Sequence, residues 1–165
     1  MEMLGWLSND FSSAVGSYRK IRKVYDQKPS IQEPEEPIVL PEVTGDIRFE
    51  HVSFHKEDQH EILHDIHFHV EAGKTIGIMG ATGSGKTSLI QLLCRLYDAT
   101  GGTIYLDNVD IRKLSLRQLR SCISTVMQDV FLFSDTIQEN VMLGQKGNLN
   151  ISDVRLASRD AQASE

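Results

Sequence analysis

One eight-residue stretch constrains this chain more than any other. Residues 80–87 read Gly-Ala-Thr-Gly-Ser-Gly-Lys-Thr, which fits the pattern G-x-x-x-x-G-K-[ST]. The apolar run 75–79 leads into it, and the segment from 85 to about 98, with apolar residues at helical spacing, follows it. A strand, a glycine-rich turn and a helix in this order predict a loop whose backbone N–H groups surround an anion.

The residues of this loop suit the binding of a nucleoside triphosphate with Mg²⁺. Its glycines let the backbone curl, and the helix that follows adds the positive end of its dipole. Lys86 is expected to reach the β- and γ-phosphates, and the Thr87 hydroxyl to ligate Mg²⁺. The alternative is a glycine-rich turn with a chance lysine, which the flanking strand and helix disfavour. The candidate binding residues are Gly80, Ala81, Thr82, Gly83, Ser84, Gly85, Lys86 and Thr87.

Composition excludes several other classes of protein. Lys and Arg number 17 against 23 Asp and Glu, and this acidic balance makes the chain a poor nucleic-acid binder. No apolar run reaches the roughly 20 residues that a membrane-spanning helix needs. Two cysteines, Cys94 and Cys122, are too few for a disulfide framework, which favours a reducing, cytosolic location.

Prolines divide the chain into three parts. All four prolines lie between residues 29 and 41 among three glutamates, so 29–43 is predicted to be an extended linker. Before it, 1–28 is predicted to be an amphipathic helix that packs on its own domain or on a partner; a basic cluster at 19–23 leaves open the cytosolic end of a membrane helix. The apolar stripe of this helix is Leu4, Leu7, Phe11, Ala14, Tyr18, Ile21 and Tyr25.

The remaining residues, 44–165, alternate strand and helix patterns, which predicts an α/β core with some antiparallel sheet attached. The run 75–79 is expected to be a strand buried on both faces. In 62–70, Ile66, Phe68 and Val70 are expected on one face and polar residues on the other. The expected strands are 47–54, 62–70, 75–79, 103–106 and 124–128, and the expected helices are 85–98, 115–122, 136–142 and 152–163.

The order of motifs from residue 44 onward resembles the nucleotide-binding domain of exporter-type ABC transporters. The matching segments are 45–54, 62–66, 71–75, 96–98, 101–107, 119–120 and 126–140, in family order. The resemblance implies a P-loop NTPase-like α/β core with an attached antiparallel β subdomain, incomplete at the C-terminus and preceded by an N-terminal helix. It also implies that 1–28 is the cytosolic end of the last transmembrane helix.

The same resemblance implies a role for Gln128, whose amide in the family contacts Mg²⁺ or the attacking water. It implies ATP and Mg²⁺ as ligands, with Thr87 and Gln128 at the metal. It further implies a transmembrane domain and a second nucleotide-binding domain as partners, at the cytoplasmic face of the membrane. Lys56 stands where the family has an aromatic residue that stacks on adenine, so the base contact departs from the family pattern; His55 and His60 are candidate substitutes.

Several family motifs are missing from the 165 residues. They contain no Walker B strand ending in Asp-Glu, no Leu-Ser-Gly-Gly-Gln signature and no later switch histidine. Asp107 follows apolar residues, but Asn108 stands where glutamate is required, and residues 143–145 only faintly echo the signature. The chain is therefore expected to be truncated at both ends, and to bind ATP without hydrolysing it. A non-functional gene remnant and a P-loop small-molecule kinase are the alternatives.

The histidines form a second group of candidate ligands. All six lie between residues 51 and 69, and His67 and His69 share a strand face from which they could chelate a metal. No cysteine is near them, and the matching family segment is not a metal site. We therefore expect exposed histidines without a structural metal.

Overall fold

The computed structural model describes residues 2–56, 61–127, 131–144 and 149–163, and for residues 2–10 only the helical backbone. The chain forms two compact units, Met1–Ser124 and Thr125–Glu165, which are described separately below. The first unit contains the sheet and the loop at 80–87. The second contains two short helices.

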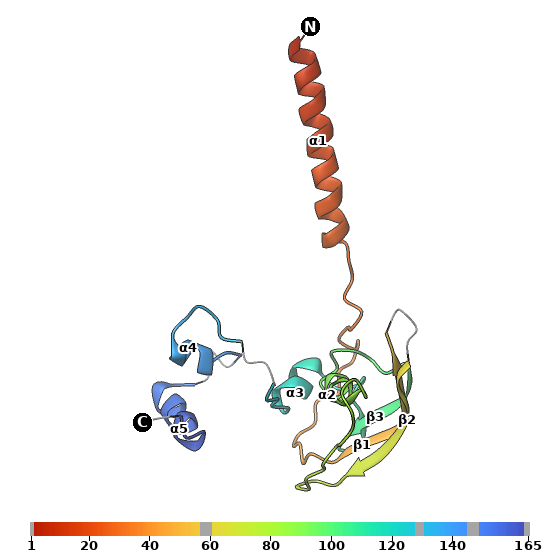
Figure 1. Ribbon diagram of the computed structural model, residues 1–165, viewed down its shortest axis with the longest axis vertical. Coiled ribbons are helices and arrows are strands. Elements are labelled where there is room, and N and C mark those ends of the chain that lie inside the picture. Colours follow the sequence, from red (N-terminus) through yellow and green to blue (C-terminus); the bar gives the residue numbers. More distant parts are fainter. Residues whose placement is uncertain (1, 57–60, 128–130, 145–148, 164–165) are drawn as a thin grey trace. The chain divides into compact units, whose positions relative to one another are not determined.

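A four-stranded antiparallel sheet forms the framework of the first unit (Figure 1). Its strands are β1 (Ile47–His55), β2 (Glu61–Val70), β3 (Gly101–Leu106) and β4 (Val109–Asp110), in the spatial order β2-β1-β3-β4. In the centre of the sheet, Phe49 of β1 lies opposite Phe68 of β2 and Ile104 of β3. The strands expected at 47–54, 62–70 and 103–106 are thus confirmed.

Local sequence explains how these strands pair. In β2, Ile66, Phe68 and Val70 are half-buried while the residues between them are exposed, as the alternation predicts. Asp107 and Asn108 join β3 to β4, and their φ angles of 49° and 63° belong to the tight hairpin turn that favours Asp and Asn. A Cβ on Gly102 would lie 2.2 Å from the carbonyl oxygen of His51, so β1 and β3 can approach there only with glycine.

The core lies between one face of the sheet and the helices α2 (Lys86–Leu93) and α3 (Leu116–Ser121). The phenyl rings of Phe49 and Phe68 stack with centroids 4.5 Å apart. Leu92 of α2 and Leu119 of α3 are fully buried against this cluster. The buried residues that form it are Phe49, Val52, Phe54, Leu63, Leu89, Leu92, Ile104, Leu106, Ile111, Leu114 and Leu119.

The proline-rich segment 29–43 contains no helix, and apart from one bridge residue no strand, and it is fixed to the first unit. Ile38 donates its N–H to the Lys113 carbonyl at 2.8 Å and bridges to Leu114. The backbone of Leu40 exchanges two hydrogen bonds with the Gln118 side chain, at 2.8 and 2.6 Å. The buried guanidinium of Arg95 donates to the Gln32 carbonyl. Residues 32–40 therefore act as part of the folded unit.

The predicted N-terminal helix is present as α1 (Glu2–Tyr25). From Phe11 onward its large apolar side chains are exposed, except that of Val15, which is half-buried. Leu4 and Leu7 of the expected stripe lie outside the described side chains. Among the described residues, no helix combines the length and the hydropathy needed to cross a membrane.

The second unit is built from α4 (Ile137–Val141) and α5 (Ile151–Asp160), which confirms the two helices expected there. Thr136 caps α4 by accepting a hydrogen bond from the N–H of Glu139 at 3.1 Å. Asn150 and Asp153 form a reciprocal capping box at the start of α5. These caps satisfy N–H groups that a helix start leaves without partners.

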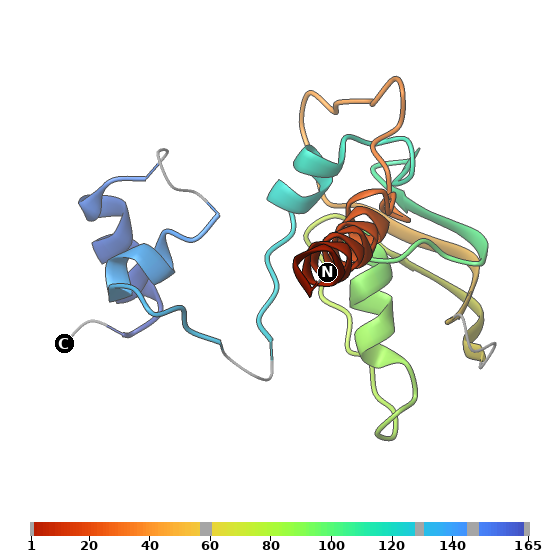
Figure 2. The same ribbon diagram turned by 90° about the horizontal axis from the view of Figure 1, so that it is seen from above.

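Two expected strands do not form. Residues 75–79 have no regular structure, and Ile76, Ile78 and Met79 are 46%, 41% and 97% exposed, so the predicted burial on both faces is wrong. Residues 124–127 of the expected strand 124–128 are likewise irregular, with Val126 fully exposed. An apolar run becomes a strand only where a neighbouring strand pairs with its backbone, and neither run pairs with any described strand. Figure 2 shows the segment between β2 and α2 as a loop outside the sheet.

Candidate nucleotide-binding site

The loop at 80–87 joins this irregular segment to α2. Gly85 is the N-cap of α2 and has a φ of 88°, in the left-handed region that favours glycine. Lys86 and Thr87 are therefore the first two residues of the helix. The helix expected over 85–98 is confirmed for Lys86–Leu93 and ends earlier than predicted, because the chain turns at Arg95, whose φ is 50°.

Close packing explains two of the loop glycines. A Cβ on Gly80 would lie 2.6 Å from the Ser84 hydroxyl oxygen, inside the curve of the loop. A Cβ on Gly85 would lie 2.7 Å from the Leu63 side chain and 3.0 Å from the carbonyl oxygen of Ile62. Gly80 thus leaves room inside the loop, and Gly85 lets the start of α2 approach β2.

The ammonium group of Lys86 lies inside the loop. It donates hydrogen bonds to the carbonyl oxygens of Gly80 at 2.8 Å and Ala81 at 2.7 Å, and to the Ser84 hydroxyl at 3.3 Å. The side chain therefore turns back from the helix over residues 80–84. This geometry concentrates a positive charge at the centre of the loop.

The start of α2 adds backbone N–H donors to the positive charge of Lys86. Its first turn contains no acidic residue, and Gly85 provides no side-chain cap. The first helical N–H groups have no partner within the helix, because intrahelical bonding begins with the N–H of Leu89 to the Gly85 carbonyl at 3.2 Å. With the Lys86 ammonium and the exposed Thr87 hydroxyl nearby in sequence, this donor set fits a phosphate group with a bound cation.

Gln128 and His60 lie outside the described residues, so their expected roles stay predictions. Gln145, in the segment 143–145 that weakly resembles the signature motif, also lies outside them. The roles assigned to the eight loop residues likewise stay predictions, since the geometry describes their arrangement and not a bound ligand.

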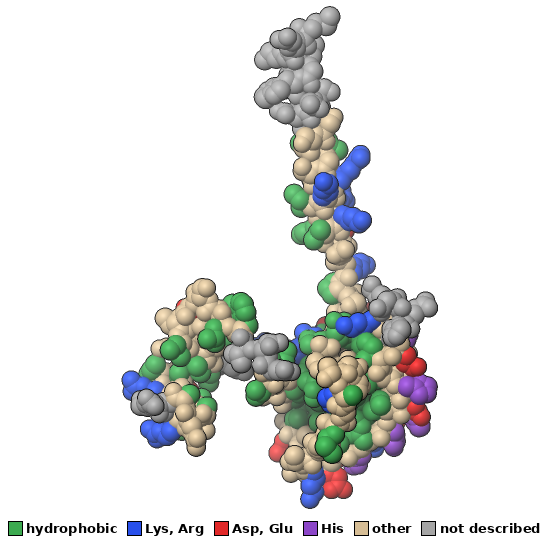
Figure 3. Space-filling view, in the orientation of Figure 1, with side chains coloured by type: hydrophobic (Ala, Val, Ile, Leu, Met, Phe, Trp, Pro, Cys, Tyr) green, Lys and Arg blue, Asp and Glu red, His purple; other side chains and the backbone are tan. Residues whose placement is uncertain are grey.

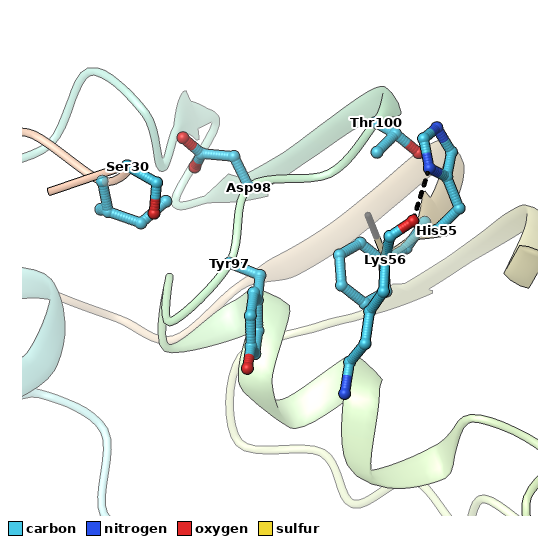
Figure 4. Close-up of a pocket in the computed structure, with 8 residues that line it drawn as sticks. Ser30, His55, Lys56, Tyr97, Asp98 and Thr100 are labelled. Carbon is cyan, nitrogen blue, oxygen red and sulfur yellow. Dashed lines mark hydrogen bonds between the residues drawn. The ribbon is translucent and has the colours of Figure 1, made fainter. Parts of the chain in front are cut away.

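A hollow of about 580 Å³ contains Lys56, the residue at the expected base position (Figure 4). The Lys56 ammonium lies 5.8 Å from the centroid of the Tyr97 ring, which itself lies 5.6 Å from that of Phe54. Nδ1 of His55 is hydrogen-bonded to the Lys56 carbonyl at 3.2 Å. Tyr97 is the exposed aromatic ring in this hollow, and sequence reasoning had noted it only as part of a matching segment.

Asp107, the residue that resembles a Walker B aspartate, holds the backbone that precedes β1. Its carboxylate accepts hydrogen bonds from the N–H groups of Thr44, Gly45 and Asp46 and from the Thr44 hydroxyl. Burial alone would raise the pKa of Asp107, but these hydrogen bonds to its charged form outweigh burial and lower the pKa. The carboxylate is thus committed to a structural role.

Three of the histidines each pair with one acidic residue. Three exposed pairs join His51 to Asp65 at 2.6 Å, His64 to Glu61 at 2.8 Å and His69 to Asp46 at 2.7 Å. The hydrogen bond to Glu61 raises the pKa of His64, and the hydrogen bond from His51 lowers the pKa of Asp65. The described residues contain no group of three ligands arranged to hold a metal ion.

Known proteins of similar sequence and structure identify the family. The profile of the family described as ABC transporter matches residues 63–165. The uncharacterized ABC transporter ATP-binding protein YknV of Bacillus subtilis is 40% identical over 162 residues, covering 98% of this chain and 27% of that protein. The beta-(1→2)glucan export ATP-binding/permease protein NdvA of Bartonella bacilliformis is 39% identical over 147 residues, covering 87% and 25%.

A solved structure agrees with these sequence matches. The structure of a bacterial Atm1-family ABC exporter with ATP bound superimposes with a TM-score of 0.85 at 30% identity, covering 97% of this chain and 28% of that one. This chain spans about a quarter of the length of the curated relatives that it matches. The expected combination of an α/β P-loop fold, an antiparallel β subdomain and an N-terminal helix is confirmed by this match. The chain therefore belongs to the ABC transporter family, and its sequence matches the ATP-binding part of exporter-type members.

Proposed function

We propose that this chain binds MgATP through residues 80–87. The observation that carries the proposal is the position of the Lys86 ammonium, held inside a glycine-lined loop at the start of a helix that carries no acidic residue in its first turn. The phosphate groups of a nucleotide have the charge and size that suit this cradle. Thr87 and Gln128 are the proposed contacts to Mg²⁺, which would neutralise phosphate charge.

The proposed setting is an ABC exporter that couples ATP hydrolysis to transport across a membrane. Its transmembrane domain and a second nucleotide-binding domain are the proposed partners, and the cytoplasmic face of the membrane is the proposed location. The names of the relatives support this setting, since NdvA is called an export ATP-binding/permease protein. Residues 1–28, 29–43 and 44–165 are the proposed helix, linker and ATP-binding segment.

We further propose that these 165 residues bind ATP without turning it over. Hydrolysis needs a group that orients water and a base that accepts its proton. Gln128 is an amide and cannot accept that proton at neutral pH, and Asp107 is engaged with the backbone of residues 44–46. No glutamate follows Asp107, because Asn108 occupies that position.

The test compares Lys86→Ala with Lys74→Ala in a titration with a fluorescent ATP analogue and Mg²⁺. Lys74 is an exposed lysine outside the loop and serves as a matched control. Lys86→Ala removes a charge-assisted contact worth about 1.5–3 kcal/mol, so affinity should fall roughly tenfold to a hundredfold, while Lys74→Ala stays at the wild-type value. Equal binding by all three proteins overturns the proposal.

A steady-state assay of phosphate release tests the second part. We expect no release above the background of the Lys86→Ala variant. Release by the wild-type protein that disappears in Lys86→Ala would show that a base for hydrolysis exists within these residues.

A further inference from the structure

Two histidines on neighbouring strands lie side by side. Val52 of β1 pairs with Ile66 of β2 in the antiparallel ladder, and His51 and His67 are the adjoining residues on the same side of that pair. Val52 is buried, whereas both imidazoles are exposed, as alternation along a strand requires. Their ring centroids are 5.3 Å apart, with 34° between the ring planes. Figure 3 shows His and acidic side chains gathered along one edge of the first unit.

A carboxylate holds the His51 ring in place. Nδ1 of His51 is hydrogen-bonded to Oδ1 of Asp65 at 2.6 Å. The backbone of Asp65 is fixed in turn, because its N–H donates to the Ser53 hydroxyl oxygen at 3.0 Å. An ionised carboxylate accepts hydrogen bonds and does not donate them, so it favours the His51 tautomer in which Nδ1 carries the proton. Nε2 of His51 then keeps its lone pair and is available as a ligand.

The neighbouring histidines of β2 are engaged differently. Nδ1 of His64 is hydrogen-bonded to Glu61 at 2.8 Å, and Nε2 of His69 to Asp46 at 2.7 Å. The His67 ring forms no hydrogen bond to another residue that the structure describes. The ring that lies against His67 is that of His51, so the structure pairs histidines across two strands and not along β2.

We propose that His51 and His67 bind one Zn²⁺ ion through their imidazole nitrogens. Zn–N bonds of about 2.0–2.1 Å require the two donor nitrogens to lie within about 4 Å of each other, which side chains with neighbouring rings can reach. The bond from Nδ1 of His51 to Asp65 is the carboxylate–histidine–metal arrangement that orients metal-binding histidines.

This site is an exchangeable one at the protein surface. The described residues contain no group of three ligands, so water is expected to complete the coordination of the ion. Imidazole nitrogen suits Zn²⁺ and similar transition metals, whereas Mg²⁺ prefers oxygen ligands. The site is therefore separate in place and in chemistry from the proposed MgATP site at residues 80–87.

The test is isothermal titration of the full chain, without a histidine tag, with ZnCl₂ in the absence of nucleotide. The wild type should bind Zn²⁺ saturably, and His51→Asn and His67→Gln should each lower the affinity by roughly tenfold or more, because each removes one of two protein ligands. Asparagine tolerates the φ of 50° at position 51. Asp65→Asn keeps the shape of the side chain but removes its charge, and should lower the affinity roughly tenfold.

The matched control is His64→Gln, which removes an exposed histidine of β2 that pairs with Glu61. It should bind Zn²⁺ as the wild type does. Cys94 and Cys122 remain in every variant, so any binding of Zn²⁺ to thiols is common to all of them. Circular dichroism checks that each variant keeps the wild-type fold.

Two results overturn the proposal. One is the absence of saturable Zn²⁺ binding by the wild type, or equal affinity in the wild type, His51→Asn and His67→Gln. The other is a loss of affinity in His69→Gln with full affinity in His51→Asn, because the ligands would then lie along β2 alone. All variants should keep the wild-type affinity for ATP, so these outcomes are independent of the proposed function.

Discussion

The sheet and the segment between β2 and α2 are neighbours in sequence and differ in how well they are buried. Phe49, Val52 and Leu63 in β1 and β2 are less than 5% exposed, and most of the strand backbone is paired in registered ladders. A few residues later, Ile76, Ile78 and Met79 are equally apolar but largely exposed and unpaired with any described strand. Apolar composition is therefore insufficient to explain which of the two regions forms strands.

The difference lies in where each region finds its partners. β1, β2 and β3 lie within about sixty residues of one another and pair as antiparallel neighbours, with local turns to connect β3 and β4. A strand that is apolar on both faces needs neighbours on each side, brought together by longer crossover connections. Local pairing thus gives the antiparallel sheet its stability, and the loop at 80–87 depends for its shape on Gly80, Gly85 and Lys86.

The largest expected effect is on the core beneath the sheet. Phe49→Ala removes a ring that is 2% exposed and stacked on Phe68, so it should lower the free energy of unfolding by about 3–5 kcal/mol. The control, Ile78→Ala, removes an apolar side chain that is 41% exposed and should cost less than about 1 kcal/mol. Urea denaturation followed by circular dichroism measures both. Similar losses for the two variants would show that residues 75–79 are packed in solution.

The next effect comes from matched glycine substitutions in the two regions. Gly102→Ala places a Cβ 2.2 Å from the His51 carbonyl oxygen at a φ of 73°, and should cost about 2–4 kcal/mol. Gly77→Ala meets no heavy atom within 4 Å and should change stability by less than about 0.5 kcal/mol. The same denaturation experiment applies. A tolerated Gly102→Ala would contradict the close approach of β1 and β3.

A smaller effect is expected at the start of β1. Asp107→Asn keeps a residue that tolerates a positive φ and replaces a charged acceptor of four hydrogen bonds by an amide, so it should cost about 1–2 kcal/mol at pH 7. Asp26→Asn, in an exposed pair with Arg22, should cost little and serves as the control.

The pH dependence of this cost follows from the lowered pKa of Asp107. A carboxyl group whose folded pKa is lowered stabilises the fold fully above its ordinary pKa of 3.8. That contribution is lost as the pH falls towards the lowered folded value, because both states then become protonated. Wild type and Asp107→Asn should therefore differ most near neutrality and converge below about pH 4. A difference that does not change with pH would show that the hydrogen bonds do not depend on the charge.

The sequence predicted most elements of this fold because their signals are local. Alternation in 62–70, the Asp-Asn turn and the periodicity after Gly85 each depend on neighbours within a few residues. The predictions for 75–79 and 124–127 were wrong because burial of a parallel strand depends on residues distant in sequence. Local patterns likewise did not predict the hydrogen bonds that join Ile38 and Leu40 to residues 113–118.

The same distinction applies to the candidate site. The motif located Lys86 and the two loop glycines with close contacts, Gly80 and Gly85, because it encodes a continuous stretch of backbone. It gave no indication that Lys56 would lie beside Tyr97, since 41 positions separate these residues in the chain. Nor did composition show that Asp107 holds residues 44–46, which depends on the register of β1 against β3.

The smallest effect on both regions should come from removing residues 1–28. The described side chains of α1 are exposed, apart from the half-buried Val15, so the truncation should change the free energy of unfolding by less than about 0.5 kcal/mol and leave the affinity for ATP at its wild-type value. Removing residues 1–43 is the matched control. It also deletes Glu33, which accepts a hydrogen bond from the Leu116 N–H, and it deletes the backbone hydrogen bonds of Ile38 and Leu40. That longer truncation should destabilise the sheet and α3 measurably. If the shorter truncation already weakened nucleotide binding in the fluorescence titration, α1 would have to be counted as part of the nucleotide-binding unit.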